Sequence, residues 1–434
     1  MGTRAHLTHL AWAVLVAVII VVGAHAGNEE FANFPWIPYD HPSIQYLERA
    51  HDDRVGKLQK QLDSGESKLT YDAKSGYLPD LLKRLNVNRD SQVLVFTKTS
   101  FQAPHISPAT PRALYFSDDV YVGSVRDGDV LEIMSLEPKQ GMQFYTLDVH
   151  MSQQPTLIRR EMVCLQCHMS PGTLNIPGLL ISSSYSSADG TPAFRGAQDI
   201  TDHRTPLEDR WGGWYVTGTA GRLAHRGNAI ASNSRQPREL NLTNLDRKFD
   251  KSPYLEGTSD IVALMTLEHQ TRMTDLITRF GWEARVAIAD GKLDAFEKRL
   301  TFGVNEIVTY MLFAEEAKIK DPIAGNSTFT KTFPLRGPRD KKGRSVRDFD
   351  LQTRLFRYPL SYMIYSEAFD SMPELVRDRV YQKLYDVLTG RDADAKFARL
   401  SSEDRRNIRE ILLDTKPGLP GYWRDAASSS SGLQ

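Results

Sequence analysis

The stretch ALYFSDDVYVGSVRDGDVLEIMSLEPKQGMQFYTLDV, residues 113–149, decides the fold of this chain. Short runs of β-branched and aromatic residues alternate in it with turn residues, which is typical of strands joined by hairpins. Asp127-Gly128 is a hairpin signal, because tight turns between strands favour residues that tolerate positive φ. A similar run lies at 93–96. The pattern therefore predicts an antiparallel β-meander over residues 91–150.

The chain after residue 258 has a different period. Apolar residues at steps of three and four predict a helix over about 259–280, with Ser259 as its N-cap. Farther on, Pro373 and Gly390 bracket another helix, and Ser401 with Asp404 forms the capping box of a last one. We therefore expect an α+β fold, with a β-rich N-terminal half packed against a helical C-terminal half.

These patterns divide the chain into successive regions. The expected regions are a signal peptide at 1–26, an N-terminal arm with helices at 27–90, a β-rich region at 91–257, a helical region at 258–425 and a disordered Ser-rich tail at 426–434. The β-rich region contains the motif that carries the chemistry, which is described below.

The first 26 residues are typical of an export signal. Arg4 is the only charged residue before Glu29, and the run Leu10–Gly23 is apolar throughout. Ala24-His25-Ala26 then places small residues where a signal peptidase cleaves. The apolar core is shorter than the roughly 20 residues that span a bilayer, which favours cleavage over an uncleaved anchor in the inner membrane. Either outcome predicts a periplasmic or otherwise exported protein.

Composition excludes several classes of protein. The chain has 434 residues, of which 41% are hydrophobic and 25% charged, so it is neither disordered nor collagen-like. Its 54 basic and 54 acidic residues balance, which predicts no nucleic-acid partner. Two cysteines cannot form a disulfide-dense scaffold.

Both cysteines lie in one motif, Cys164-Leu165-Gln166-Cys167-His168, which has the spacing of c-type haem attachment. Residues three apart share a helix face, so both thiols can meet the vinyl groups on one haem edge. His168 can then bind the iron as its proximal ligand. The motif predicts one covalent haem c. Three alternatives stay open: a structural zinc site with two further ligands, a thioredoxin-like redox pair, and a strained disulfide.

On this motif the chain resembles the c-type cytochromes. It also resembles a group of large bacterial proteins described only as cytochrome c domain-containing, through CLQCH at 164–168, TDHRTPLEDRWGGWYVTGTAG at 201–221 and RLFRYPLSYMIYSEAF at 354–369. The first resemblance implies covalent haem, and the second implies no particular activity. The chain is several times longer than a small soluble cytochrome c, and β-like sequence flanks its motif on both sides. The usual all-helical haem pocket is therefore not implied.

The sixth iron ligand has three candidates. His269 lies in an apolar stripe of the 259–280 helix, either as a distal ligand or as a core histidine with an internal partner. His203 and His225 lie in a segment rich in His, Arg and Trp. Within that segment, Arg210 could pair with haem propionates and Trp211 could pack on the porphyrin, although a solvated loop of ion pairs is the alternative.

The sequence thus predicts an exported mono-haem cytochrome that transfers electrons to or from a redox partner protein. A haem enzyme with an open sixth iron position is the first alternative. A haem-based sensor, or a structural subunit of a periplasmic complex, is the second. The length of the chain favours an enzyme, whereas the lack of a recognisable catalytic set favours electron transfer.

Overall fold

The structure is a computed structural model that describes residues 34–50, 52–160, 162–193, 199–231 and 244–424. The expected signal peptide at 1–26 and Ser-rich tail at 426–434 lie outside these described residues. Within them, no helix has both the length and the apolar character that crossing a membrane requires.

The expected β-meander is present and forms most of an antiparallel sheet. Seven strands follow the order β6-β5-β4-β3-β2-β1-β9. Their bounds are β1 (Val93–Val95), β2 (Arg112–Phe116), β3 (Val120–Ser124), β4 (Val130–Glu137), β5 (Gly141–Asp148), β6 (Leu157–Arg159) and β9 (Trp214–Tyr215). Asp127 has φ 57° in the turn between β3 and β4, as the hairpin signal predicts. β9 comes much later in the sequence than its neighbour β1, and the two strands pair Tyr215 with Leu94. A separate short pair joins β7 (Ser182–Ser183) to β8 (Asp199–Ile200).

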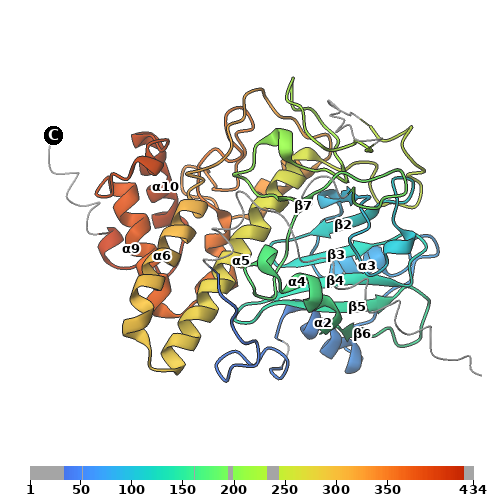
Figure 1. The fold of residues 1–434 in the computed structure, drawn as a ribbon, viewed down its shortest axis with the longest axis horizontal. Helices are drawn as coiled ribbons and strands as arrows, with labels where there is room; N and C mark the ends of the chain where they lie inside the picture. The colour runs from blue at the N-terminus through green and yellow to red at the C-terminus, as the bar shows by residue number, and fades with distance from the viewer. Residues whose placement is uncertain (1–33, 51, 161, 194–198, 232–243, 425–434) are drawn as a thin grey trace, which may run out of the picture.

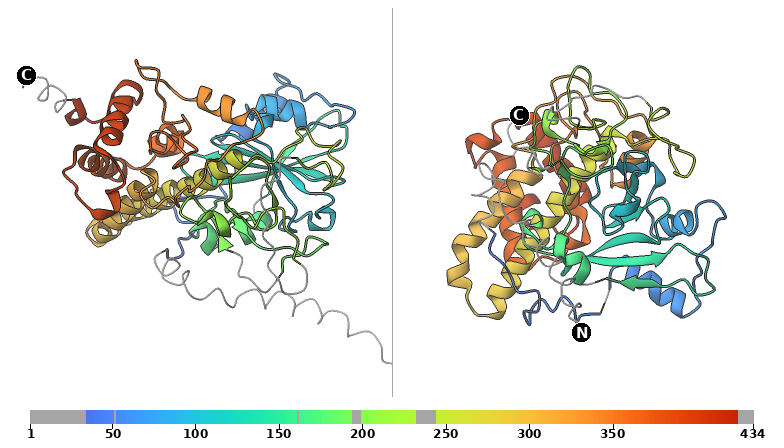
Figure 2. Two further views of the ribbon diagram at one scale, coloured as in Figure 1. Left: turned by 90° about the horizontal axis from the view of Figure 1, so that it is seen from above. Right: turned by 45° about the vertical axis from the view of Figure 1, so that its right-hand side comes forward.

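Helices dominate the second half of the chain, which confirms the predicted α+β class. The helices are α2 (Arg54–Asp63), α3 (Leu78–Arg84), α4 (Met162–His168), α5 (Ile261–Ala289), α6 (Leu293–Met311), α7 (Phe329–Thr332), α8 (Glu367–Asp370), α9 (Glu374–Thr389) and α10 (Ser402–Thr415). The long α5 runs between the sheet on one side and α6, α9 and α10 on the other (Figure 1). The views in Figure 2 show the same arrangement from two further directions.

The helix caps agree with the sequence at two places and differ at a third. Gly390 ends α9 with φ 77°, and Ser401 starts α10 with the expected capping box. The N-cap of α5 is Asp260, whose carboxylate accepts two amides of the first turn, so the expectation of Ser259 was wrong. The Ser259 hydroxyl instead donates to the Tyr215 carbonyl at 2.6 Å, which ties the start of α5 to the sheet edge.

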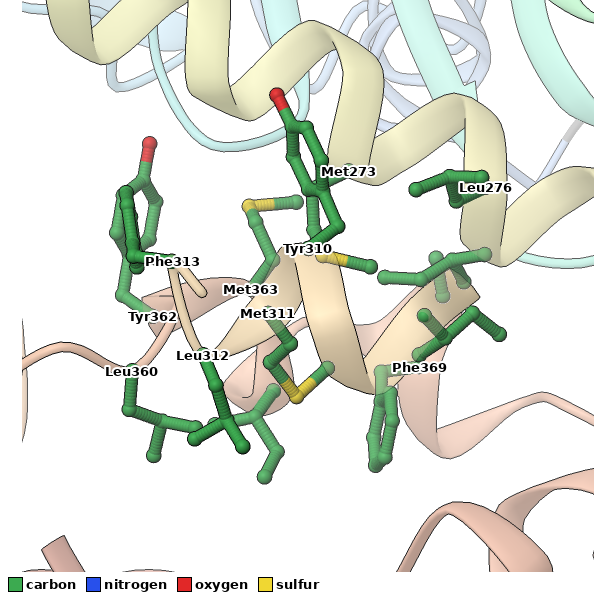
Figure 3. Close-up of a cluster of buried hydrophobic side chains, with 14 of the residues drawn as sticks. Met273, Leu276, Tyr310, Met311, Leu312, Phe313, Leu360, Tyr362, Met363 and Phe369 are labelled. Carbon is green, nitrogen blue, oxygen red and sulfur yellow. The ribbon is translucent and has the colours of Figure 1, made fainter. Parts of the chain in front are cut away.

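Helix α5 is the centre of the molecule. The expected apolar stripe is buried, but the opposite face is buried as well and carries polar side chains such as Glu268, which pairs with Arg210. One core fills the space between the sheet, α5 and the C-terminal helices, and a second lies on the other sheet face beneath α2 and α3. Figure 3 shows part of the first core, where Met273 of α5 lies near Tyr310 and Met363. A polar residue on α5 can therefore reach several elements at once.

Candidate haem-attachment site

Helix α4 carries the whole Cys-x-x-Cys-His motif. Cys164 and Cys167 are one turn apart on it, so their side chains lie on one face. Cys164 is half-buried against the main core, whereas Cys167 is exposed, and both are free thiols. Leu165 and Met169 are buried and hold the helix in place. The motif is therefore anchored in the core, with Cys167 exposed and Cys164 half-buried.

The side chain of His168 has the tautomer of a metal ligand. Its Nδ1 lies 3.0 Å from the carbonyl oxygen of Gly178, which can only accept, so Nδ1 carries the proton. Nε2 is then unprotonated, and no partner for it is found among the described residues. The ring also packs against Phe144, with centroids 5.0 Å apart. Burial lowers the pKa of His168, which favours the neutral form that binds metals.

A short loop brings Gly178 back to His168. The amide of Gly178 donates to the His168 carbonyl at 2.9 Å, so the two residues bond reciprocally. Within the loop, Ser170 and Thr173 form a capping box around a 3-10 turn. Leu174 then takes φ 58° and turns the chain back. The orientation of His168 is thus set by a local, fully bonded loop.

The three alternatives for the cysteine pair find less support in this geometry. Burial, with the charge of Glu132, raises the pKa of Cys164 to about 11, whereas a thioredoxin-like pair relies on a lowered thiol pKa. No cluster of three or more metal-ligating side chains occurs in the described part of the chain, so a four-ligand zinc site has no further ligands there. No disulfide joins the two thiols. Two thiols on one helix face, followed by an Nδ1-protonated histidine, fit covalent haem.

A cavity of about 280 Å³ lies beside the loop that follows the motif. Its walls come from Pro171 and Gly172, from the segment 200–206, and from Arg272 of α5. Within that segment Arg204 and Asp202 form an ion pair at 2.7 Å. Arginines at this place suit carboxylate groups such as haem propionates. The His- and Arg-rich segment therefore lines a cavity beside the loop that follows the motif, through residues before the predicted Arg210 and Trp211.

The structure places Arg210 and Trp211 in the core, away from the lining of that cavity. Arg210 pairs with Glu268 of α5 at 2.9 Å, and both side chains are almost completely buried. The Trp211 ring is also fully buried, and it meets His225 edge-on at 5.4 Å between centroids. The Arg210–Glu268 pair holds this segment onto α5.

The three candidate distal histidines are also held by other groups. His203 and His269 approach each other, with 2.8 Å between their Nδ1 atoms, and Nε2 of His269 lies 2.7 Å from the Ser361 hydroxyl. Burial lowers the pKa of His225 to about 4. No hydrogen bond or ring contact joins any of the three to α4 within the described residues. The structure therefore pairs two of the candidates, His203 and His269, with each other.

Sequence reasoning missed one residue near the motif. Asp275 of α5 accepts the Leu179 amide at 3.1 Å, directly beside the Gly178 carbonyl that orients His168. No local signal distinguishes Asp275, because α5 also carries Glu268, Arg272, Arg279 and Glu283. Its partner lies 96 positions away, and no local pattern indicates that distance.

No protein-family model, curated protein or solved structure matches this chain. The fold and the site themselves define its class: a mixed α+β protein with one Cys-x-x-Cys-His helix near an antiparallel sheet and a central buried helix. Its function is therefore argued from the chemistry of that helix.

Proposed function

We propose that this protein is an exported c-type cytochrome that binds one haem c covalently and takes part in electron transfer. Cys164 and Cys167 would form the thioethers, and His168 would be the proximal iron ligand. The observation that carries the proposal is the tautomer of His168. Its Nδ1 proton is committed to Gly178, which leaves the Nε2 lone pair for a metal.

The surroundings of α4 suit the exchange of electrons with a protein partner. When bound, the haem supplies one-electron chemistry, and the chain holds and orients it. Met162 and Val163 are exposed by 55% and 53%, beside the exposed Cys167. The attachment edge of the haem would thus lie near the surface, with apolar side chains around it that suit a transient redox partner. We propose a periplasmic location, with membrane contact only if the N-terminal segment remains uncleaved.

A haem enzyme with an open sixth iron position is a second candidate. One observation favours it: each candidate distal histidine already has a core contact, His203 and His269 with each other and His225 with Trp211. The cavity beside the loop after the motif, lined by Arg272 and by the Arg204–Asp202 pair, would give a small anionic substrate a place to bind.

Covalent attachment is tested by producing the full chain in a bacterium that matures c-type haem and staining a denaturing gel for haem. The wild type should retain haem, and the double variant Cys164→Ala/Cys167→Ala should lose it. The control is His150→Ala, because His150 is exposed and lies outside the motif. A wild type without covalent haem, or a double variant that keeps it, would overturn the proposal.

The visible spectrum of the same protein separates the two candidates. A sharp low-spin spectrum that carbon monoxide leaves unchanged means two protein ligands and supports electron transfer. A high-spin spectrum, or one altered by carbon monoxide, supports the enzyme instead.

A further inference from the structure

A single peptide group connects His168 to helix α5. The carbonyl of Gly178 accepts the Nδ1 proton of His168 at 3.0 Å, and the amide of Leu179 donates to Oδ1 of Asp275 at 3.1 Å. This carbonyl and this amide belong to the same planar unit. The imidazole and the carboxyl group are therefore bonded to opposite ends of one dipole.

The close approach of Asp275 depends on a glycine. A Cβ atom at position 178 would lie 2.3 Å from Oδ1 of Asp275, far inside van der Waals contact. Gly178 therefore meets two needs: its backbone bonds His168, and its lack of a side chain lets the carboxyl group approach. Any larger residue would push Asp275 away from the Leu179 amide.

Asp275 is poorly explained as a stabilising residue. It is almost completely buried, and its Oδ2 atom has no hydrogen-bond partner in the described structure. Burial raises the pKa of its carboxyl group well above the usual range, against the opposing charge of Arg272, so the neutral acid is favoured. A half-satisfied buried polar group costs stability, and such groups in native proteins often serve another role.

We propose that Asp275 is a positioning residue that tunes the proximal ligand His168 through the Gly178–Leu179 peptide. The inference rests on the proposed haem binding. A hydrogen bond at the amide end polarises the peptide and strengthens the acceptor at its carbonyl end. A stronger acceptor makes the imidazole a more basic ligand, which favours oxidised iron and lowers the reduction potential.

The test measures the reduction potential of the haem-loaded protein by spectroelectrochemical titration. Asp275→Leu removes the acceptor at similar volume and should make the potential more positive. Asp275→Asn keeps an oxygen acceptor for the Leu179 amide, so its potential should stay close to that of the wild type. Thr274→Val is the matched control, because Thr274 is the buried neighbour on α5 and bonds only within its helix. It should leave the potential unchanged.

A second variant guards against misfolding of Asp275→Leu. Gly178→Ala keeps Asp275 but forces it away from the peptide, and it should shift the potential in the same direction. An unchanged potential in the variants that load haem would overturn the role of Asp275. A wild type that lacks covalent haem would instead overturn the proposed function, so the two failures are distinguishable.

Discussion

His203 and His269 share a hydrogen bond between their Nδ1 atoms, 2.8 Å apart, with their rings stacked at 14°. Burial lowers the pKa of both well below the usual range, so both are neutral and one Nδ1 donates to the other. Tyr310 and Phe313 stack on the pair, and Ser361 bonds the far side of His269. His269 thus has a partner on both ring nitrogens, whereas Nε2 of His203 has no hydrogen-bond partner in the described structure. Binding iron through His269 would require one of its two bonds to break.

Replacement of His269 tests that conclusion. His269→Leu leaves Nδ1 of His203 without its partner and removes one bond of the Ser361 hydroxyl, which keeps only the Met363 amide. The free energy of unfolding should therefore fall by about 2–3 kcal/mol in urea titrations. The haem spectrum should stay the same. His150→Ala, at an exposed site, should change stability by less than about 0.5 kcal/mol. Conversion of a low-spin haem to high spin in His269→Leu would instead identify His269 as the distal ligand.

Because Arg210 and Glu268 form a buried ion pair, we expect the effects of their substitutions on stability to be strongly coupled. Burial raises the pKa of Glu268 to about 7 although Arg210 opposes the shift, so a lone charge in this place is costly. Arg210→Met should destabilise the fold by about 3–5 kcal/mol. The double variant Arg210→Met/Glu268→Leu should recover much of that loss, as measured by a double-mutant cycle of urea unfolding. Additive effects of the two changes would contradict the coupling.

Acid sensitivity should depend on His225. Its pKa falls from 6.5 in the unfolded chain to about 4 in the folded protein, because burial disfavours the charged ring. The unfolded chain therefore takes up the proton first. The stability present above pH 6.5 is lost as the pH falls toward 4, by up to about 3 kcal/mol.

His225→Phe keeps an aromatic ring beside Trp211 and removes this titration. The difference in melting temperature between wild type and variant should change between pH 6.5 and 4 and stay constant above pH 7. The other buried acidic groups titrate in both proteins, so their contributions cancel in this difference. Parallel curves over the whole range would rule out a buried neutral His225.

Alanine substitutions at two glycines with positive φ can separate the stability cost of backbone strain from the cost of steric contact. Gly141, at φ +90°, would place a Cβ 2.7 Å from the Pro177 carbonyl oxygen and 2.9 Å from Thr278 Cγ2, whereas Gly65, at φ +74°, has nothing within 4 Å. Gly65→Ala should cost about 1–2 kcal/mol from conformation alone. Gly141→Ala should cost about 1–3 kcal/mol more in urea unfolding, because it displaces the loop that holds Gly178. Equal losses of stability in the two variants would mean that the loop around Pro177 moves aside without a measurable cost.

The sequence by itself determined the features that depend on neighbouring residues. Asp127-Gly128 predicts its turn because Asp127 tolerates the positive φ that it takes there, and Ser401 with Asp404 caps α10 within one turn. The spacing of Cys164, Cys167 and His168 is equally local, so the candidate attachment site was predicted from five consecutive residues. The change of period near residue 258 predicted the α+β class.

Only the tertiary structure decided which distant groups meet. Periodicity indicates that His269 is buried, but its partner His203 lies 66 positions away, and the partner of Asp275 lies 96 positions away. Ser259 looked like a helix cap, yet its hydroxyl bonds the sheet edge, and Asp260 caps α5. A buried polar group must find a partner, but packing chooses which of many candidates comes within hydrogen-bond distance. That choice depends on how the sheet, the loop after α4 and α5 pack together, and no stretch of sequence contains it.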